Sequence, residues 1–80
     1  MAASRFRGLA LAYEAANIGG TMPTVFNAAN EEAVARFLDH KIGFLDIYDE
    51  IEKAMRAHKV ISDPTVSQIL DAEKEARENA

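Results

Sequence analysis

Three short helix-breaking segments constrain the fold of this chain more than any other feature of its sequence. They are Gly19-Gly20, His40 to Gly43, and Val60 to Pro64. The 80 residues include only four glycines and two prolines, and no stretch alternates polar and apolar residues for long. The segments between the breaks have apolar residues at helical spacing. We therefore predict an all-α fold, a four-helix bundle with short connections, in which successive helices are antiparallel.

The four predicted helices form one helical domain over residues 1–80, because a chain of this length holds a single core. Their approximate ranges are 4–18, 23–39, 45–57 and 66–79. Gly19 is suited to the position after the first helix, because glycine adopts positive φ without strain. Thr65 and Gln68 have the spacing of a capping box at the start of the last helix.

Charge and composition argue against several functional classes. Nine Lys and Arg residues stand against thirteen Asp and Glu, a net charge of −4, whereas nucleic-acid and anionic-membrane binders need clustered positive charge. The absence of cysteine excludes disulfides, thiolate metal sites and thiol nucleophiles, and it fits a cytosolic setting. No apolar run approaches the ~20 residues of a membrane span, and the start does not read as a signal peptide. We expect neither a nucleic-acid nor a membrane partner.

The first helix has apolar residues on two nearly opposite sides. One stripe consists of Leu9, Ala12, Tyr13 and Ala16. The other consists of Leu11, Ala15 and Ile18. A helix that is apolar on two sides either lies at the centre of its own bundle or docks on something outside it.

Two asparagines fall within the apolar stripe of the second helix. That predicted stripe consists of Phe26, Ala33, Val34 and Phe37. At ~100° per residue, Asn30 lies in the middle of this stripe and Asn27 lies beside it. A buried amide is costly unless it is hydrogen-bonded. We interpret both as structural side chains that bond the loop backbone near residues 42–44, with a ligand or partner contact as the alternative.

Few other polar residues suggest chemistry. Glu73 and Arg77 are four residues apart and predict an ion pair that fixes helix register, rather than a catalytic carboxylate, because no second acid or nucleophile accompanies them. The two histidines, His40 and His58, lack converging partners at metal-ligand spacing. Gly19-Gly20 alone is a helix stop and not a phosphate loop. The sequence therefore predicts no catalytic, cofactor-binding or metal-binding residue.

Four segments together resemble a known enzyme family. They are Leu9-Ala10-Leu11-Ala12-Tyr13-Glu14-Ala15, Gly19-Gly20-Thr21-Met22-Pro23, Asn27-Ala28-Ala29-Asn30-Glu31 and Ile42-Gly43-Phe44-Leu45-Asp46-Ile47. In this order and spacing they resemble the C-terminal domain of 1-deoxy-D-xylulose-5-phosphate reductoisomerase. The last two segments are the specific ones, and the resemblance extends from about Phe6 to Arg77.

The resemblance implies the role of a larger enzyme, which belongs to the non-mevalonate pathway of isoprenoid biosynthesis. That enzyme converts 1-deoxy-D-xylulose 5-phosphate to 2-C-methyl-D-erythritol 4-phosphate with NADPH and a divalent metal. Its cofactor and metal sites lie in the N-terminal and central domains, so no catalytic residue carries over to this chain. The resemblance further implies a homodimeric enzyme in the bacterial cytoplasm.

The resulting hypothesis is a structural domain that is inactive alone and whose partner is the catalytic domain of the same enzyme. The stripe of Leu11, Ala15 and Ile18 is then the candidate docking surface for that domain. The alternative is a free-standing helical protein-interaction module. A helix-turn-helix DNA binder is disfavoured by the negative charge and by the lack of a basic recognition helix.

Overall fold

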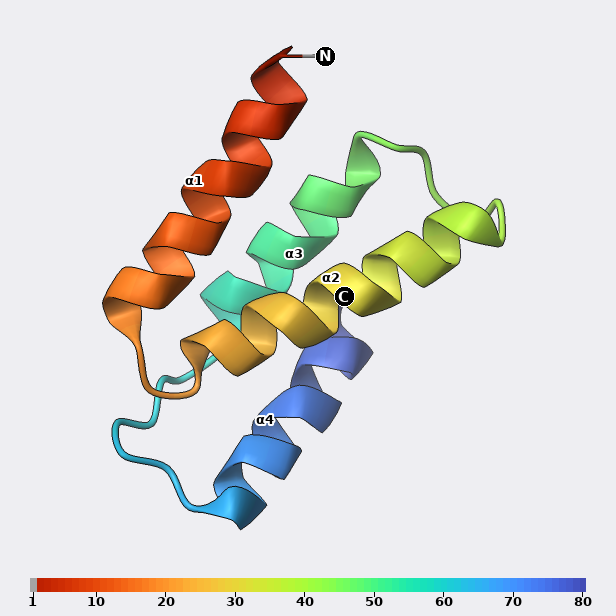
Figure 1. Cartoon of the computed structure of the whole chain (residues 1–80). Coiled ribbons are helices and arrows are strands. Elements are labelled where there is room, and N and C mark those ends of the chain that lie inside the picture. Colours follow the sequence, from red (N-terminus) through yellow and green to blue (C-terminus); the bar gives the residue numbers. More distant parts are fainter. Residues whose placement is uncertain (1) are drawn as a thin grey trace.

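Four α-helices make up this protein in a computed structural model that describes the backbone of residues 2–80 and the side chains of residues 6–80 (Figure 1). The helices are α1 (Ala2–Ile18), α2 (Met22–Leu38), α3 (Asp46–Ala57) and α4 (Val66–Asn79). Residues 2–80 contain no strand. The predicted all-α, four-helix fold with short connections is confirmed. Each observed helix begins and ends within two residues of its predicted range. Across these residues, no helix has the length and apolar character needed to cross a membrane.

Helix α2 lies at the centre of the arrangement. It packs against all three other helices, and α3 also packs against both α1 and α4. Within residues 2–80, α1 and α4 make no contact with each other, and they lie apart in Figure 1. α1 is therefore held on one side only, by α2 and α3.

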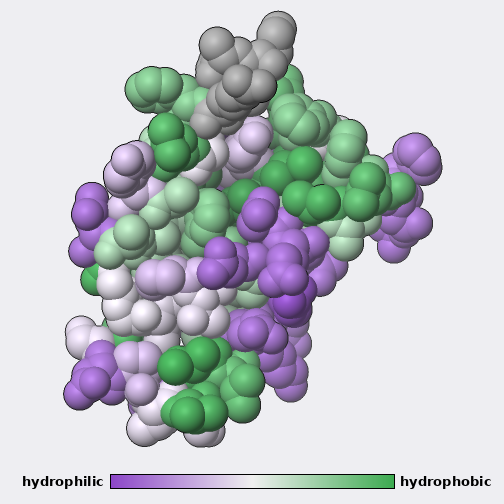
Figure 2. Space-filling model, in the orientation of Figure 1, coloured by the Kyte–Doolittle hydropathy of each residue, from purple (hydrophilic) through white to green (hydrophobic). Residues whose placement is uncertain are grey.

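Small residues dominate the buried core. The residues that pack together there are Leu11, Ala15, Met22, Val25, Ala28, Ala29, Ala33, Ile47, Ile51, Ala54, Met55, Ala72, Ala76 and Ala80. Alanine at a helix contact lets the neighbouring backbones approach closely. Larger apolar residues often lie outside this core. Figure 2 shows a hydrophobic area over the connection between α2 and α3, where Leu38, Phe44 and Leu45 are exposed.

The stripe of α1 that was predicted to dock on another domain faces the core of this one. Leu11 and Ala15 are buried in the core of this same chain, so the predicted docking surface of Leu11, Ala15 and Ile18 is wrong. Ile18 is exposed, at the end of the helix where the chain turns. The contacts with α2 and α3 select the side that carries Ala15. The large side chains of Leu9 and Tyr13 point to solvent instead.

Two helix ends have the residues and geometry predicted from the sequence. Gly19 follows α1 with φ of 72°, and Thr65 and Gln68 form both hydrogen bonds of a capping box. Thr21 occupies the cap position of α2, but its side chain makes no capping hydrogen bond. Its hydroxyl instead contacts His58 and Ile61, which follow α3.

Charged side chains join α1 to α3 along one flank. Arg7 pairs with Asp49 and Glu52, each at 2.8 Å between nitrogen and oxygen. Arg56 pairs with Glu14 and also with Glu52, the latter at 3.1 Å. Both charged residues of α1 whose side chains are described, Arg7 and Glu14, are therefore engaged by α3.

This network predicts acid sensitivity. The hydrogen bond from Arg7 lowers the pKa of Glu52 below its ordinary value of 4.5. A carboxyl group with a lowered folded-state pKa contributes stability above its unfolded pKa, and this contribution is lost as pH falls through the folded pKa. We expect the free energy of unfolding to fall as pH drops below about 4.5, and the Arg7→Gln variant to show a shallower fall. Urea unfolding at a series of pH values measures both. Identical pH profiles for the unmodified chain and the Arg7→Gln variant would contradict the stabilising role of the pair between Arg7 and Glu52.

Candidate functional site

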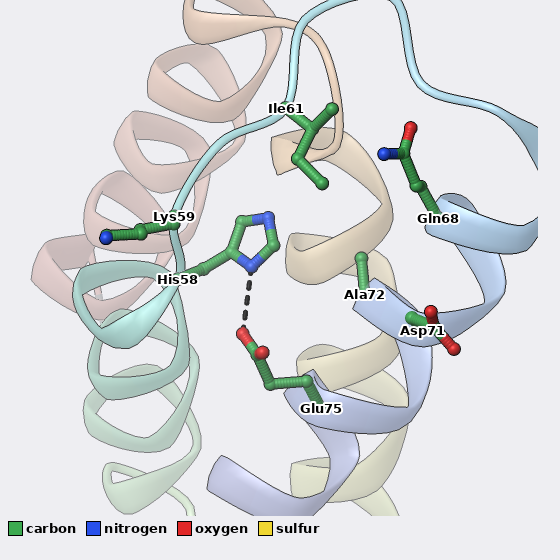
Figure 3. Close-up of a pocket in the computed structure, with 7 residues that line it drawn as sticks. All are labelled: His58, Lys59, Ile61, Gln68, Asp71, Ala72 and Glu75. Carbon is green, nitrogen blue, oxygen red and sulfur yellow. Dashed lines mark hydrogen bonds and ion pairs between the residues drawn. The ribbon is translucent and has the colours of Figure 1, made fainter.

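A shallow hollow of about 320 Å³ lies between the end of α3, the following loop and α4. Its lining residues are His58, Lys59, Ile61, Gln68, Asp71, Ala72 and Glu75 (Figure 3). α3 ends at Ala57, and the loop that follows it supplies the first three of these residues. The other four belong to α4, against which that loop passes. Here an imidazole lies against both a hollow and a carboxylate.

The His58 side chain is enclosed and joins three segments of the chain. Its side chain is only 5% exposed. Nδ1 lies 2.9 Å from Oε1 of Glu75 on α4, the contact drawn in Figure 3. Nε2 lies 2.6 Å from Oγ1 of Thr21 at the start of α2. The Thr21 oxygen also accepts a hydrogen bond from the backbone N–H of Ile61 at 3.0 Å.

These partners assign the hydrogen atoms of the cluster. A carboxylate only accepts, so Nδ1 of His58 carries the proton that it donates to Glu75. In the tautomer with its proton on Nδ1, the ring accepts at Nε2 from the hydroxyl of Thr21. Thr21 thus donates once and accepts once, and no buried polar side-chain atom of the described residues is left without a partner. The buried polar side-chain atoms of the cluster therefore all have hydrogen-bond partners.

The order hydroxyl, imidazole, carboxylate is also that of a hydrolytic triad, yet this one lacks access. Thr21 is 0% exposed, so a substrate cannot reach its oxygen. The same oxygen already accepts from Ile61. A nucleophile must approach the reacting carbon to about 3 Å, and the burial of Thr21 prevents it. The cluster therefore acts as a structural clamp between α2, α4 and the loop after α3.

Removing the Thr21 hydroxyl should weaken this clamp. In the Thr21→Val variant, the Ile61 N–H and Nε2 of His58 both lose their partner, and an unsatisfied buried group costs about 1–3 kcal/mol. We expect a loss of that size in the free energy of unfolding, measured by urea denaturation. The matched control is Thr24→Val, because Thr24 is a half-buried threonine on the same helix outside this cluster. Equal effects of the two substitutions would contradict the clamp.

No group of three or more His, Asp or Glu side chains within the described part of the chain is placed to hold a metal ion. His40 is exposed in the connection after α2, with φ of 60°. His58 has a single carboxylate partner, Glu75.

The structure does not place the two asparagines as predicted. Asn27 is exposed and Asn30 is half-buried, so the predicted inward position of Asn27 is wrong. Neither amide makes a hydrogen bond with the 42–44 loop, where Gly43 donates to Asp46 instead. The reason is a rotation of α2, whose fully buried side carries Val25, Ala29 and Ala33, while Phe26 and Phe37 pack against this core only partly buried.

Glu73 and Arg77 do lie close together on α4, at 3.9 Å between Oε1 and Nε. Arg77 also approaches Glu31 and Glu32 of α2, at 3.5 and 4.0 Å. Both side chains are partly exposed, so the pair contributes little stability by itself. Its geometry suits an electrostatic link between α2 and α4.

Sequence reasoning missed the roles of Thr21 and Glu75. His58 is 37 positions from Thr21 and 17 positions from Glu75, so no local sequence spacing indicates that these residues meet. One signal was present, because His58 follows the apolar stripe of α3, where an imidazole becomes enclosed and then needs partners.

Comparison with known proteins places this chain among enzymes of much greater length. Residues 1–79 match the family model described as the DXP reductoisomerase C-terminal domain. The 1-deoxy-D-xylulose 5-phosphate reductoisomerase of Lachnospira eligens is 62% identical over 69 residues, which are 86% of this chain and 18% of that protein. The enzyme of the same name from Halalkalibacterium halodurans is 53% identical over 73 residues, or 91% of this chain and 19% of that protein.

A solved structure agrees with these relatives. The 1-deoxy-D-xylulose 5-phosphate reductoisomerase of Zymomonas mobilis, solved in complex with NADPH, superposes with a TM-score of 0.82 at 44% identity. The match covers 89% of this chain and 19% of that one. This chain thus spans about a fifth of the length of the relatives that it matches. It belongs to the DXP reductoisomerase family and corresponds to the C-terminal domain of that enzyme.

Proposed function

We propose that this chain is the structural C-terminal domain of an NADPH-dependent oxidoreductase, the reductoisomerase that converts 1-deoxy-D-xylulose 5-phosphate to 2-C-methyl-D-erythritol 4-phosphate. The observation that carries the proposal is the family match over residues 1–79, combined with relatives about five times longer. On this proposal the reaction belongs to the whole enzyme, and the domain alone is not catalytic.

The contacts of the described side chains support a non-catalytic role. The one imidazole that lies beside both a hydroxyl and a carboxylate is His58, and its threonine partner is inaccessible. Acid–base and nucleophilic catalysis need a group that reaches the substrate.

The NADPH and the divalent metal of the whole enzyme do not fit the residues of this domain. The Zymomonas mobilis enzyme, which is about five times longer than this chain, was solved in complex with NADPH. This chain has no glycine-rich phosphate loop, and its described acidic residues form no metal-binding group. We therefore assign the binding of both to the rest of the enzyme.

The proposed partner is the catalytic domain of the same polypeptide, within a homodimeric enzyme of the bacterial cytoplasm. The negative net charge supports the absence of a nucleic-acid or membrane partner. A domain of 80 residues buries a small core, so contact with the rest of the enzyme also stabilises it.

The test is a turnover assay on two proteins. The purified 80-residue chain and a full-length reductoisomerase that contains it are each incubated with 1-deoxy-D-xylulose 5-phosphate, NADPH and Mg²⁺, and NADPH oxidation is followed. We expect turnover by the full-length enzyme and none by the chain alone. Substrate-dependent oxidation by the chain alone, lost in the His58→Ala variant, would overturn the non-catalytic role.

A further inference from the structure

Among the described side chains of α1, residues 6–18, one exposed face carries no charge. Its residues are Phe6, Leu9, Ala10, Tyr13, Ala16 and Asn17, and we call it the outward face of α1. Leu9 is 56% exposed and Tyr13 is 64% exposed. An exposed helix face on a free-standing domain ordinarily carries charged residues. The lack of any charge on this face between Phe6 and Asn17, over about three turns of helix, is typical of a surface that is covered in the complete protein.

The described charged residues of α1 lie away from its outward face. Arg7 and Glu14 lie on the flank next to α3, where Asp49, Glu52 and Arg56 pair with them. Their charges are therefore neutralised within the domain. The outward face is left with two aromatic rings and a leucine, the side chains that contribute most to buried interfaces.

The relatives indicate what covers this face. They are about five times longer than this chain, which matches their C-terminal domain, so the remainder of their sequence precedes the helix that corresponds to α1. In those relatives the helix that corresponds to α1 is the first of the domain after that remainder. A surface on a covalently linked neighbour meets its partner at a high effective concentration, which favours docking within one polypeptide over pairing with a second copy.

We infer that the outward face of α1 docks against the part of the reductoisomerase polypeptide that precedes this domain. The inference rests on the proposed function. The outward face takes the place of the docking surface predicted from the sequence, which lies on the opposite side of α1. That side is not free to dock, because Leu11 and Ala15 are buried in the core of the domain. Arg7 and Glu14 then form one edge of the interface, where they are already paired.

Thiol labelling tests this directly, because the 80-residue chain contains no cysteine. Leu9→Cys places a thiol on the outward face. Leu70→Cys is the matched control, since Leu70 is 59% exposed on α4, a helix that does not contact α1. Both variants are prepared in the isolated chain and in the full-length enzyme. Maleimide labelling of the peptide that contains the new cysteine is timed by mass spectrometry.

In the isolated chain the two thiols should react at similar rates. In the full-length enzyme we expect the Leu9→Cys thiol to react more than about tenfold more slowly, because thiol reactivity depends on access, while the Leu70→Cys thiol keeps its rate. Equal rates at both positions in the full-length enzyme would overturn the inference. Protection of the Leu70→Cys thiol alone would overturn it too, by placing the interface on α4.

Two further measurements separate this inference from its alternatives. Sedimentation of the isolated chain should show a monomer, whereas a dimer that Leu9→Asp dissociates would make a second copy the partner. If the full-length protein turns over 1-deoxy-D-xylulose 5-phosphate but leaves Leu9→Cys unprotected, the docking inference alone fails. If that protein does not turn over this substrate, the proposed function fails.

Discussion

Replacement of Ile51 by alanine should lower the free energy of unfolding of this chain by about 2–5 kcal/mol, the usual range for truncation of a buried isoleucine. Ile51 is 1% exposed and belongs to α3, which packs against each of the other three helices. Because most neighbouring core residues are alanines, few long side chains are available to fill the cavity. Urea unfolding followed by circular dichroism measures the change.

The matched control is Val66→Ala, since Val66 is a β-branched residue that is 74% exposed in the first turn of α4. Its truncation should change stability by less than about 0.5 kcal/mol, as for surface substitutions in general. A small domain has little stability in reserve, and Ile51→Ala can leave the chain unfolded. Ile51→Val, with an expected loss of about 0.5–1.5 kcal/mol, then provides the measurable step. Equal effects of Ile51→Val and Val66→Ala would contradict the packing described here.

The second large effect is expected at Gly20, where we predict that alanine lowers the free energy of unfolding by about 2–4 kcal/mol. Two physical causes combine at this residue. Its φ is 55°, a conformation that a residue with a Cβ atom adopts only with strain. An added Cβ would also lie 2.4 Å from the backbone oxygen of Ile61. That oxygen accepts from the N–H of Thr21, so it cannot move away without a loss at the clamp.

Gly19→Ala separates the two causes. Gly19 also has positive φ, 72°, but a Cβ there would meet nothing within 4 Å. Only the conformational strain applies, so its cost should be about 1 kcal/mol, clearly less than at Gly20. Thermal or urea denaturation of the two variants gives the comparison. An equal loss at both positions would mean that the close approach to Ile61 has no energetic weight.

The sequence was sufficient to predict the helices. The breaks are clear, and on α3 large apolar residues and the core coincide, since Ile47, Ile51 and Met55 are all buried. The same reasoning led to the wrong side of α1 and a rotated α2. In those helices alanines such as Ala15, Ala28 and Ala29 make many of the core contacts, while large residues such as Leu9 and Tyr13 are exposed. A stripe weighted by side-chain size then misses the centre of the buried side.

The clamp around His58 could not be predicted for a different reason. It depends on where the loop after α3 passes the start of α2, and this is a property of tertiary packing. Thr21 has the sequence position of a helix cap, yet its hydroxyl bonds His58 and Ile61. The family resemblance identified the enzyme without any such detail, because it rests on the linear order of motifs.

The most direct test of a structural reductoisomerase domain is an exchange. The C-terminal domain of the Lachnospira eligens enzyme, 62% identical to this chain over 69 residues, is replaced by residues 1–80. NADPH-dependent turnover of 1-deoxy-D-xylulose 5-phosphate is then compared among the parent, the exchanged protein and the parent without the domain. We predict turnover close to that of the parent after exchange, and a severe loss after deletion. Full turnover without the domain, or a folded exchanged protein with no turnover, would contradict the role proposed here.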